Sequence, residues 1–248
     1  AKGFRYGGVN QPLPLSLCGP ELNSLGLSGG PATFGPDSLW SYSVGEKGTF
    51  LQDALRLNVT GFLVDWKNVQ TKKLLPSCAY YFIQNKGEVQ SVGLEIEAQL
   101  QLTNHLSVGM NGSFSDAKAN GDILNLSAED GDTVPYFPSY LLNFNALYER
   151  QVGDGNLILE GSWSFRDAVN TQFNTDLPSS RKIPSSDYLT LGASYQINDW
   201  EVGVFGRNLT SGTEVLLRGP TSYPAFQPGD TVSWAQPRTI GLRLKRSF

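Results

Sequence analysis

Residues 92–102 read VGLEIEAQLQL, and this stretch indicates the fold class more clearly than any other. Valine, leucine, isoleucine and alanine occupy its even positions, and glycine, glutamate and glutamine occupy the odd ones. Successive side chains of a β-strand point to opposite faces of the sheet. The alternation therefore predicts a strand with one apolar and one polar face.

The same period of two recurs along the chain and predicts nine strands. They lie at residues 39–48, 54–67, 92–102, 106–115, 140–149, 157–166, 189–197, 200–207 and 239–245. Many of them exceed the ~5–6 residues typical of soluble sheets and match the ~9–11 residues of a tilted transmembrane strand. Tyrosine and tryptophan gather at apolar strand ends, where a membrane barrel carries its aromatic girdles. These aromatic residues are Trp40, Tyr140, Tyr148, Tyr195 and Trp200.

The connections between the strands alternate in length. Short turns are expected at 49–53, 103–104, 153–155 and 198–199, and long polar loops at 68–89, 118–137, 169–186 and 210–236. Short periplasmic turns and long extracellular loops are typical of outer-membrane barrels. The sequence thus predicts an all-β chain, a transmembrane antiparallel β-barrel. A soluble β-sandwich gives the same alternation and remains the alternative.

The strand count predicts that the chain is part of something larger. Residues 1–37 are expected to form an outer loop region that follows the end of an earlier strand, and residues 38–248 to hold the nine strands. Bacterial single-chain barrels have an even number of strands, and unpaired sheet edges are not tolerated in lipid. We therefore expect a fragment of a larger barrel or half of an assembly.

Composition narrows the functional classes. The chain of 248 residues has a net charge of −4, which argues against a nucleic-acid partner, and it has no apolar run of the ~20 residues that a membrane helix needs. One methionine, one histidine and two cysteines leave little material for a metal site or a cofactor, and none is expected. Cys18 and Cys78 fall in neighbouring loops on the same side. Both a disulfide and two free thiols are compatible with the sequence.

Three motifs suggest chemistry, and each has a simpler explanation. Glu95 and Glu97 could be the paired carboxylates of a glycosidase, but neighbours on one strand face are more simply polar lumen residues. The acidic loop 121–132 could hold calcium, yet its spacing does not match an EF-hand, and a solvated loop explains it. The single histidine, His105, follows a predicted turn and has no nucleophile motif to accompany it. No catalytic site is predicted.

The order and spacing of several longer phrases carry a family resemblance. They are GFRYGGVN (3–10), DSLWSYSVGEKG (37–48), LRLNVTGFLVDWKNVQ (55–70), NKGEVQSVGLEIEAQL (85–100), VPYFPSYLLNFNALYE (134–149), DYLTLGASYQINDWEVGVFGRNLT (187–210) and PRTIGLRLKRSF (237–248). With them the chain resembles the C-terminal barrel region of TonB-dependent outer-membrane receptors over nearly its whole length.

This resemblance implies a barrel of about 22 strands whose lumen is plugged by a separate N-terminal domain, absent here. Such receptors bind a scarce nutrient at the bacterial outer membrane, such as an iron-siderophore, a cobalamin or a glycan, and import it with energy delivered through TonB. The resemblance also makes Phe248 the C-terminal aromatic that the barrel-assembly machinery recognises. Arg246 departs from the apolar residue usual two positions earlier. The implied partners are outer-membrane lipid, that machinery, TonB and a small nutrient.

Aromatic and basic residues of the outer loops are the candidate ligand-binding residues, since aromatics offer rigid contact area and arginine binds anions. They are Tyr80, Tyr81, Phe82, Arg218, Tyr223, Phe226 and Trp234. Alternatively, these side chains pack the loops together or lie at the outer lipid interface. Three other functions stay open: a passive porin-like channel, an outer-membrane lipase-type enzyme, and a soluble binding module.

Overall fold

The computed structural model describes residues 1–123, 126–176, 180–210, 215–220 and 230–247. Ten strands form one sheet in the order β1-β4-β5-β8-β9-β10-β11-β14-β15-β18, and each pairs antiparallel with its neighbours. Their bounds are β1 (Lys2–Arg5), β4 (Asp37–Phe50), β5 (Leu55–Lys67), β8 (Val89–Thr103), β9 (Leu106–Ala119), β10 (Tyr140–Val152), β11 (Gly155–Arg166), β14 (Ser186–Ile197), β15 (Trp200–Arg207) and β18 (Thr239–Arg246).

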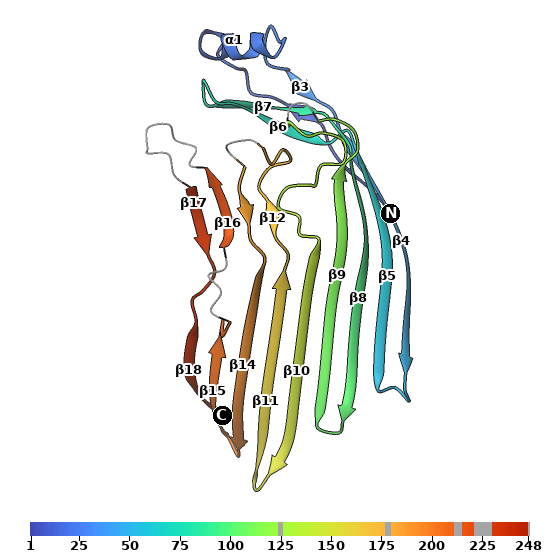
Figure 1. The fold of residues 1–248 in the computed structure, drawn as a ribbon, viewed down its shortest axis with the longest axis vertical. Coiled ribbons are helices and arrows are strands. Elements are labelled where there is room, and N and C mark those ends of the chain that lie inside the picture. Colours follow the sequence, from blue (N-terminus) through green and yellow to red (C-terminus); the bar gives the residue numbers. More distant parts are fainter. Residues whose placement is uncertain (124–125, 177–179, 211–214, 221–229, 248) are drawn as a thin grey trace.

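The long strands stand side by side as one curved wall (Figure 1). The nine strands from β4 to β18 have 8 to 15 residues and correspond one to one to the strands that the alternation predicts. The predicted antiparallel sheet is therefore confirmed. The short strand β1 pairs with the first four residues of β4 and adds a tenth strand, so β1 and β18 lie at the two edges.

The strand register gives the wall two chemically different faces. Residues opposite each other in a ladder share a face. Glu97 lies opposite Asn58 and Asn111, and Asn143 continues this polar row. On the other face the side chains are apolar. For example, Met110, Phe144, Trp163 and Leu189 lie opposite one another on neighbouring strands. Leu242 on that face is 82% exposed, as expected of a surface that lipid covers.

The two ends of the wall differ as the connection lengths predict. The connections between β4 and β5, β8 and β9, β10 and β11, and β14 and β15 are short and lie at one end (Figure 1). Gly153 and Asn198 adopt positive φ values of 60° and 51° there, as tight turns require. By the asymmetry of outer-membrane barrels this is the periplasmic end, and the opposite end is the outer one.

The outer end carries the remaining elements. These are β2 (Gly8–Val9), α1 (Leu15–Ser24), β3 (Thr33–Phe34), β6 (Gln70–Leu75), β7 (Tyr80–Asn85), β12 (Val169–Asn170), β13 (Lys182–Ile183), β16 (Val215–Pro220) and β17 (Asp230–Trp234). Among the described residues, one buried hydrophobic cluster lies between α1 and the β6–β7 hairpin, and the other joins Ala119, the last residue of β9, to Ile123 and Ala128 of the following loop. In the part of the chain that the structure describes, no helix is long and apolar enough to cross a membrane.

Candidate functional site

The outer cap, defined here as residues 6–36 together with the β6–β7 hairpin, lies across the outer end of the wall (Figure 1). Cys18 and Leu22 are four residues apart, so they share one face of α1 and bury it against the hairpin. There they form a cluster with Leu75 and Phe82, and all four side chains are fully or almost fully buried. The cap is therefore a small folded unit with its own core.

A disulfide joins the two parts of the cap. Cys18 of α1 is bonded to Cys78 in the turn of the hairpin, with their Cα atoms 5.4 Å apart. Beside it, the backbone N–H of Ser77 donates a hydrogen bond to Glu21 Oε2 at 3.0 Å, and the Ser77 hydroxyl donates to the same oxygen. Of the two cysteine states that the sequence allows, the structure contains the disulfide.

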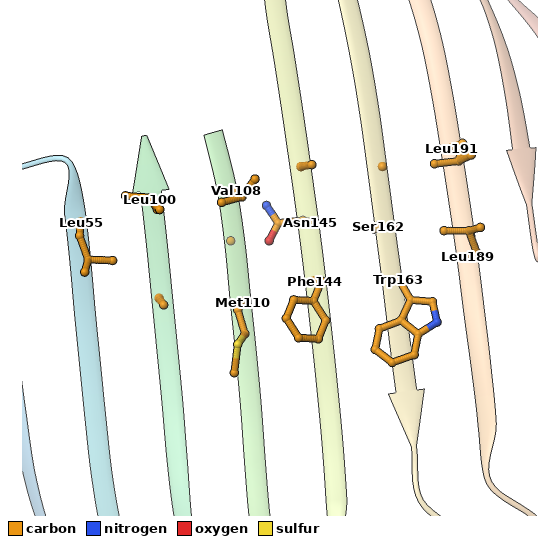
Figure 2. Close-up of a pocket in the computed structure, with 14 residues that line it drawn as sticks. Leu55, Leu100, Val108, Met110, Phe144, Asn145, Ser162, Trp163, Leu189 and Leu191 are labelled. Carbon is orange, nitrogen blue, oxygen red and sulfur yellow. The ribbon is translucent and has the colours of Figure 1, made fainter. Parts of the chain in front are cut away.

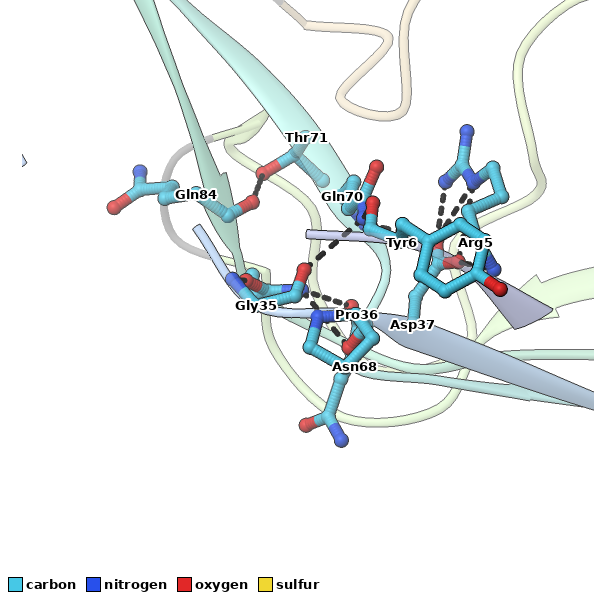
Figure 3. Close-up of polar contacts among 10 residues, drawn as sticks. Arg5, Tyr6, Gly35, Pro36, Asp37, Asn68, Gln70, Thr71 and Gln84 are labelled. Carbon is cyan, nitrogen blue, oxygen red and sulfur yellow. Dashed lines mark hydrogen bonds and ion pairs between the residues drawn. The ribbon is translucent and has the colours of Figure 1, made fainter. Parts of the chain in front are cut away.

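Amide side chains pin the hairpin to the N-terminal segment. Asn10 donates from Nδ2 to the carbonyl of Ile83 at 2.7 Å, and its Oδ1 accepts the N–H of Ile83 at 2.8 Å. Gln70 donates from Nε2 to the carbonyls of Tyr6 at 2.9 Å and Gly35 at 3.0 Å (Figure 3). Asn85 accepts the Gly35 N–H and donates back to the Gly35 carbonyl at 3.0 Å. These side chains act as partners for backbone groups that no strand pairs.

An ion pair clamps the base of the cap (Figure 3). Arg5 at the end of β1 donates from Nε to both carboxylate oxygens of Asp37, at 3.1 and 3.0 Å, and a further bond comes from Nη2. Asp37 is 2% exposed and also accepts the backbone N–H of Gln70 at 3.3 Å. The Arg5 guanidinium lies 4.9 Å from the centre of the Trp66 ring. Nothing in the sequence pattern pairs two residues so far apart.

The ion pair changes the pKa of the Asp37 carboxyl. Asp37 is the first residue of β4 and lies closer to the outer end of the wall than the aromatic residue Trp40. Hydrogen bonds from Arg5 are the main cause that lowers the pKa of the Asp37 carboxyl, and the bond from Gln70 acts in the same direction. The carboxylate therefore stays ionised into more acidic solution than an ordinary aspartate would.

The structure divides the candidate aromatic residues of β7. Tyr80 and Tyr81 are exposed, and the Nζ of Lys72 lies 3.8 Å from the centre of the Tyr81 ring. Phe82 is 1% exposed and belongs to the cluster around the disulfide. The Phe82 side chain fills the core of the cap and is not exposed at its outer surface, whereas ligand contact by Tyr80 and Tyr81 stays a prediction. For Phe82 the alternative that the sequence left open, packing the loops together, describes the position.

The last loop provides a second group at the other end of the strand order. Arg218 lies on β16 and Trp234, 59% exposed, on β17. The hydroxyl of Tyr136 donates to the Arg218 carbonyl at 3.2 Å and so connects this two-stranded ribbon to the loop before β10. Tyr223 and Phe226, and the terminal Phe248, lie outside the described residues.

The acidic loop before β10 uses its carboxylates to hold its own backbone. Asp130 accepts the N–H of Gly121 at 2.7 Å, Asp122 accepts the N–H of Asp130 at 3.0 Å, and Asp132 accepts the N–H of Glu129 at 2.8 Å. Among the described residues, no group of histidine, cysteine and carboxylate side chains has an arrangement that could hold a metal ion. The acidic residues therefore have a local structural explanation.

The polar face of the wall carries hollows and charged side chains. One hollow of about 300 Å³ has Glu95, Glu97, Asn58, Asn111 and Asn143 in its lining. Nearer β18, Arg243 lies 3.9 Å from Glu160 and 3.6 Å from Glu201. In a closed barrel this face would point into the lumen, so these residues would form its polar wall.

Comparison with known proteins agrees with this architecture. The chain matches the sequence profile of the family described as TonB dependent receptor-like, beta-barrel, over residues 1–209. None of the curated proteins matches the chain.

Among solved structures, the ferric yersiniabactin uptake receptor FyuA from Yersinia pestis is similar, with a TM-score of 0.74 at 16% identity. That likeness covers 100% of this chain and 34% of the receptor. BauA, the ferric preacinetobactin receptor from Acinetobacter baumannii, has a TM-score of 0.63 at 17% identity, with coverage of 100% and 34%. The ferric citrate transporter FecA has a TM-score of 0.61 at 17% identity, with coverage of 86% and 32%. The chain thus spans about one third of these proteins, and at such identities the likeness concerns the fold.

Proposed function

This chain belongs to the TonB-dependent receptor β-barrel family, a family of Gram-negative outer-membrane proteins, and on that premise we propose that it serves energised uptake of a scarce nutrient. Its contribution is part of the barrel wall and of the outer surface where the nutrient first binds. The observation that carries the proposal is a two-faced wall of long strands that ends in a disulfide-bonded outer cap. In the same proposal, energy is supplied through TonB, and the barrel-assembly machinery inserts the protein.

A ferric chelate is the nutrient class that the comparisons favour. Three of the proteins with similar structures are receptors or transporters of ferric yersiniabactin, ferric preacinetobactin and ferric citrate. Tyr80 and Tyr81 on the cap, with Arg218 and Trp234 on the β16–β17 ribbon, are the proposed contact residues. Their aromatic rings and guanidinium suit an anionic or aromatic chelate. Phe82 has no direct role in this proposal.

The test is uptake by cells that produce the full-length protein, meaning the longer receptor of which this chain is proposed to be a part, in a host that lacks its own iron receptors. We expect accumulation of at least one radiolabelled ferric chelate from a panel that includes ferric citrate, and loss of accumulation in a strain without TonB. Uptake that persists without TonB would contradict the proposal in favour of a passive channel. No uptake of any ferric chelate would overturn the nutrient class.

The contact residues are tested with a double variant. Tyr80→Ala with Tyr81→Ala should weaken chelate binding to whole cells by roughly tenfold or more, because each ring supplies contact area worth about 1 kcal/mol or more. Tyr140→Ala, which removes an equally exposed tyrosine from the membrane face of β10, is the matched control and should leave binding unchanged. Equal affinities in the double variant and the wild type would exclude Tyr80 and Tyr81 as contacts.

A further inference from the structure

The apolar face of the wall contains a groove of about 480 Å³ (Figure 2). Its lining includes Ala146 and Gly161 on the neighbouring strands β10 and β11, with Phe144 and Trp163 beside them. These side chains lie on the face opposite the polar row of Asn58, Glu97 and Asn111, so the groove opens toward lipid and not toward the lumen.

The groove follows from a step in side-chain size between two adjacent rows. One row runs Val108, Ala146, Gly161, Leu191 across β9, β10, β11 and β14. The next row toward the outer end runs Met110, Phe144, Trp163, Leu189 across the same strands. Small side chains beside bulky ones leave a hollow at Ala146 and Gly161. A Cβ atom added to Gly161 would lie 3.2 Å from Leu191 Cδ2, so Leu191 closes one side.

A cationic side chain lies on the same face, beyond the periplasmic side of the groove. Arg150 is four residues from Ala146 along β10, which is roughly 13 Å at the rise of a β-strand. Arg150 lies opposite Leu157 in the register, and Tyr148, between Ala146 and Arg150 on the same face, lies opposite Leu159. These neighbours show that Arg150 is on the apolar face. Arg150 is exposed and lies two residues before the end of β10, at the level of the periplasmic interface. A guanidinium at that depth is suited to a phosphate.

We propose that the groove and Arg150 form a binding site for one phospholipid of the periplasmic leaflet. An acyl chain lies over Ala146 and Gly161 against Trp163 and Phe144, and the phosphate accepts hydrogen bonds from Arg150. Two features support this occupant: apart from Asn145 and Ser162 the lining is apolar, on a surface that faces the membrane, and the cation lies where a headgroup is found. The site is independent of the nutrient that the protein imports.

The experiment is a titration of the detergent-purified full-length protein with dioleoyl phosphatidylglycerol, read by native mass spectrometry as the affinity for the first bound lipid. Gly161→Leu fills the groove, and Arg150→Gln removes the charge. We expect each variant to weaken that first binding step by about tenfold. Ala146→Leu fills the same groove from β10 and replaces Gly161→Leu if that variant does not fold.

Matched controls exist on the same wall. Gly61→Leu makes the same change on the apolar face of β5, where a Cβ would meet only the Val44 carbonyl oxygen at 3.9 Å, outside the groove. Arg56→Gln removes a guanidinium from the polar face near the same end of β5. Both controls should bind lipid as the wild type does. If Gly61→Leu weakens binding as much as Gly161→Leu, the lipid is unspecific, and the proposal fails. It also fails if Arg150→Gln has no effect.

Discussion

At the scale of single residues, Asp37 shows how one buried carboxylate organises a surface. It lies where β1, β4 and the start of β6 meet, and it is bonded to Arg5 and to the backbone of Gln70. Because hydrogen bonds lower its pKa, the ionised form is the stabilised one. The stability that it contributes is fully present above the ordinary aspartate pKa. It is lost only as the pH falls through the lowered value, so the clamp should persist in mildly acidic medium.

We predict that Asp37→Asn loosens residues 1–36. The change leaves Arg5 without its carboxylate and should cost roughly 1–3 kcal/mol of local stability, typical of a lost hydrogen bond to a charged group. Limited proteolysis and hydrogen exchange of the full-length protein would measure it. Asp65→Asn is the matched control, since its pair with Lys67 spans 3.7 Å at the surface and should contribute little. Equal protection in the two variants would contradict the clamp.

At the scale of elements, the alternation in β8 assigns each side chain to one of the two faces of the wall. Leu94 lies opposite Gly61 and Phe114 on the apolar face, whereas Glu95 lies opposite Thr60 and Ser113 on the polar face. Adjacent residues of the strand therefore point to opposite sides, one toward lipid and the next toward the lumen.

The alternation predicts opposite results for one substitution at two adjacent positions. Leu94→Arg should destabilise the barrel by about 2–4 kcal/mol near the middle of the membrane, and Glu95→Arg should change stability far less. Urea unfolding of the full-length protein in lipid vesicles would measure both. Similar losses at the two positions would mean that the assignment of faces is wrong.

A second prediction at this scale concerns α1. Replacing both cysteines, Cys18→Ala with Cys78→Ala, removes the covalent link between the helix and the hairpin. Disulfides commonly contribute about 2–4 kcal/mol, and the effect here should be confined to the cap. Hydrogen exchange in residues 15–24 should accelerate by roughly tenfold or more, while β5 and β8 keep their protection. Unchanged exchange in α1 would show that the amide hydrogen bonds and the buried cluster hold the helix in place without the disulfide.

At the scale of the whole molecule, the described sheet has an edge at each end of the strand order, β1 and β18. Lipid offers no partner for unpaired backbone groups, and only closed barrels satisfy them. The backbone of Ser41 is hydrogen-bonded to Ala1. Beyond Ser41, the described residues provide no partner for β4 on the edge that faces away from β5.

We therefore predict that residues 1–248, expressed alone with an outer-membrane targeting signal, do not form a monomeric, heat-modifiable, protease-resistant barrel. The full-length protein is the positive control and should show that behaviour in the same membrane fraction. A protease-resistant monomer from residues 1–248 would mean that the edges close on each other. In that case the proposal that this chain forms only part of the wall of a larger receptor barrel would be wrong.

The sequence by itself determined the nine long strands, their two faces and the end that carries the long loops, but not the short strand β1 or the short strands of the outer end. Each of these depends on neighbouring residues only: a period of two separates lipid-facing from lumen-facing side chains, and glycine or asparagine marks the short turns. The alternation at 92–102 is enough to place Leu94 on the apolar face of its strand and Glu95 on the polar face.

Only the tertiary structure decided how the outer segments pack. It paired Cys18 with Cys78 and buried Phe82 while leaving Tyr81 exposed. It also joined Arg5 to Asp37 and placed Gly161 beside Ala146 in a groove. The physical reason is that these contacts depend on the register between strands and on the packing of loops remote in the chain, which no local periodicity specifies.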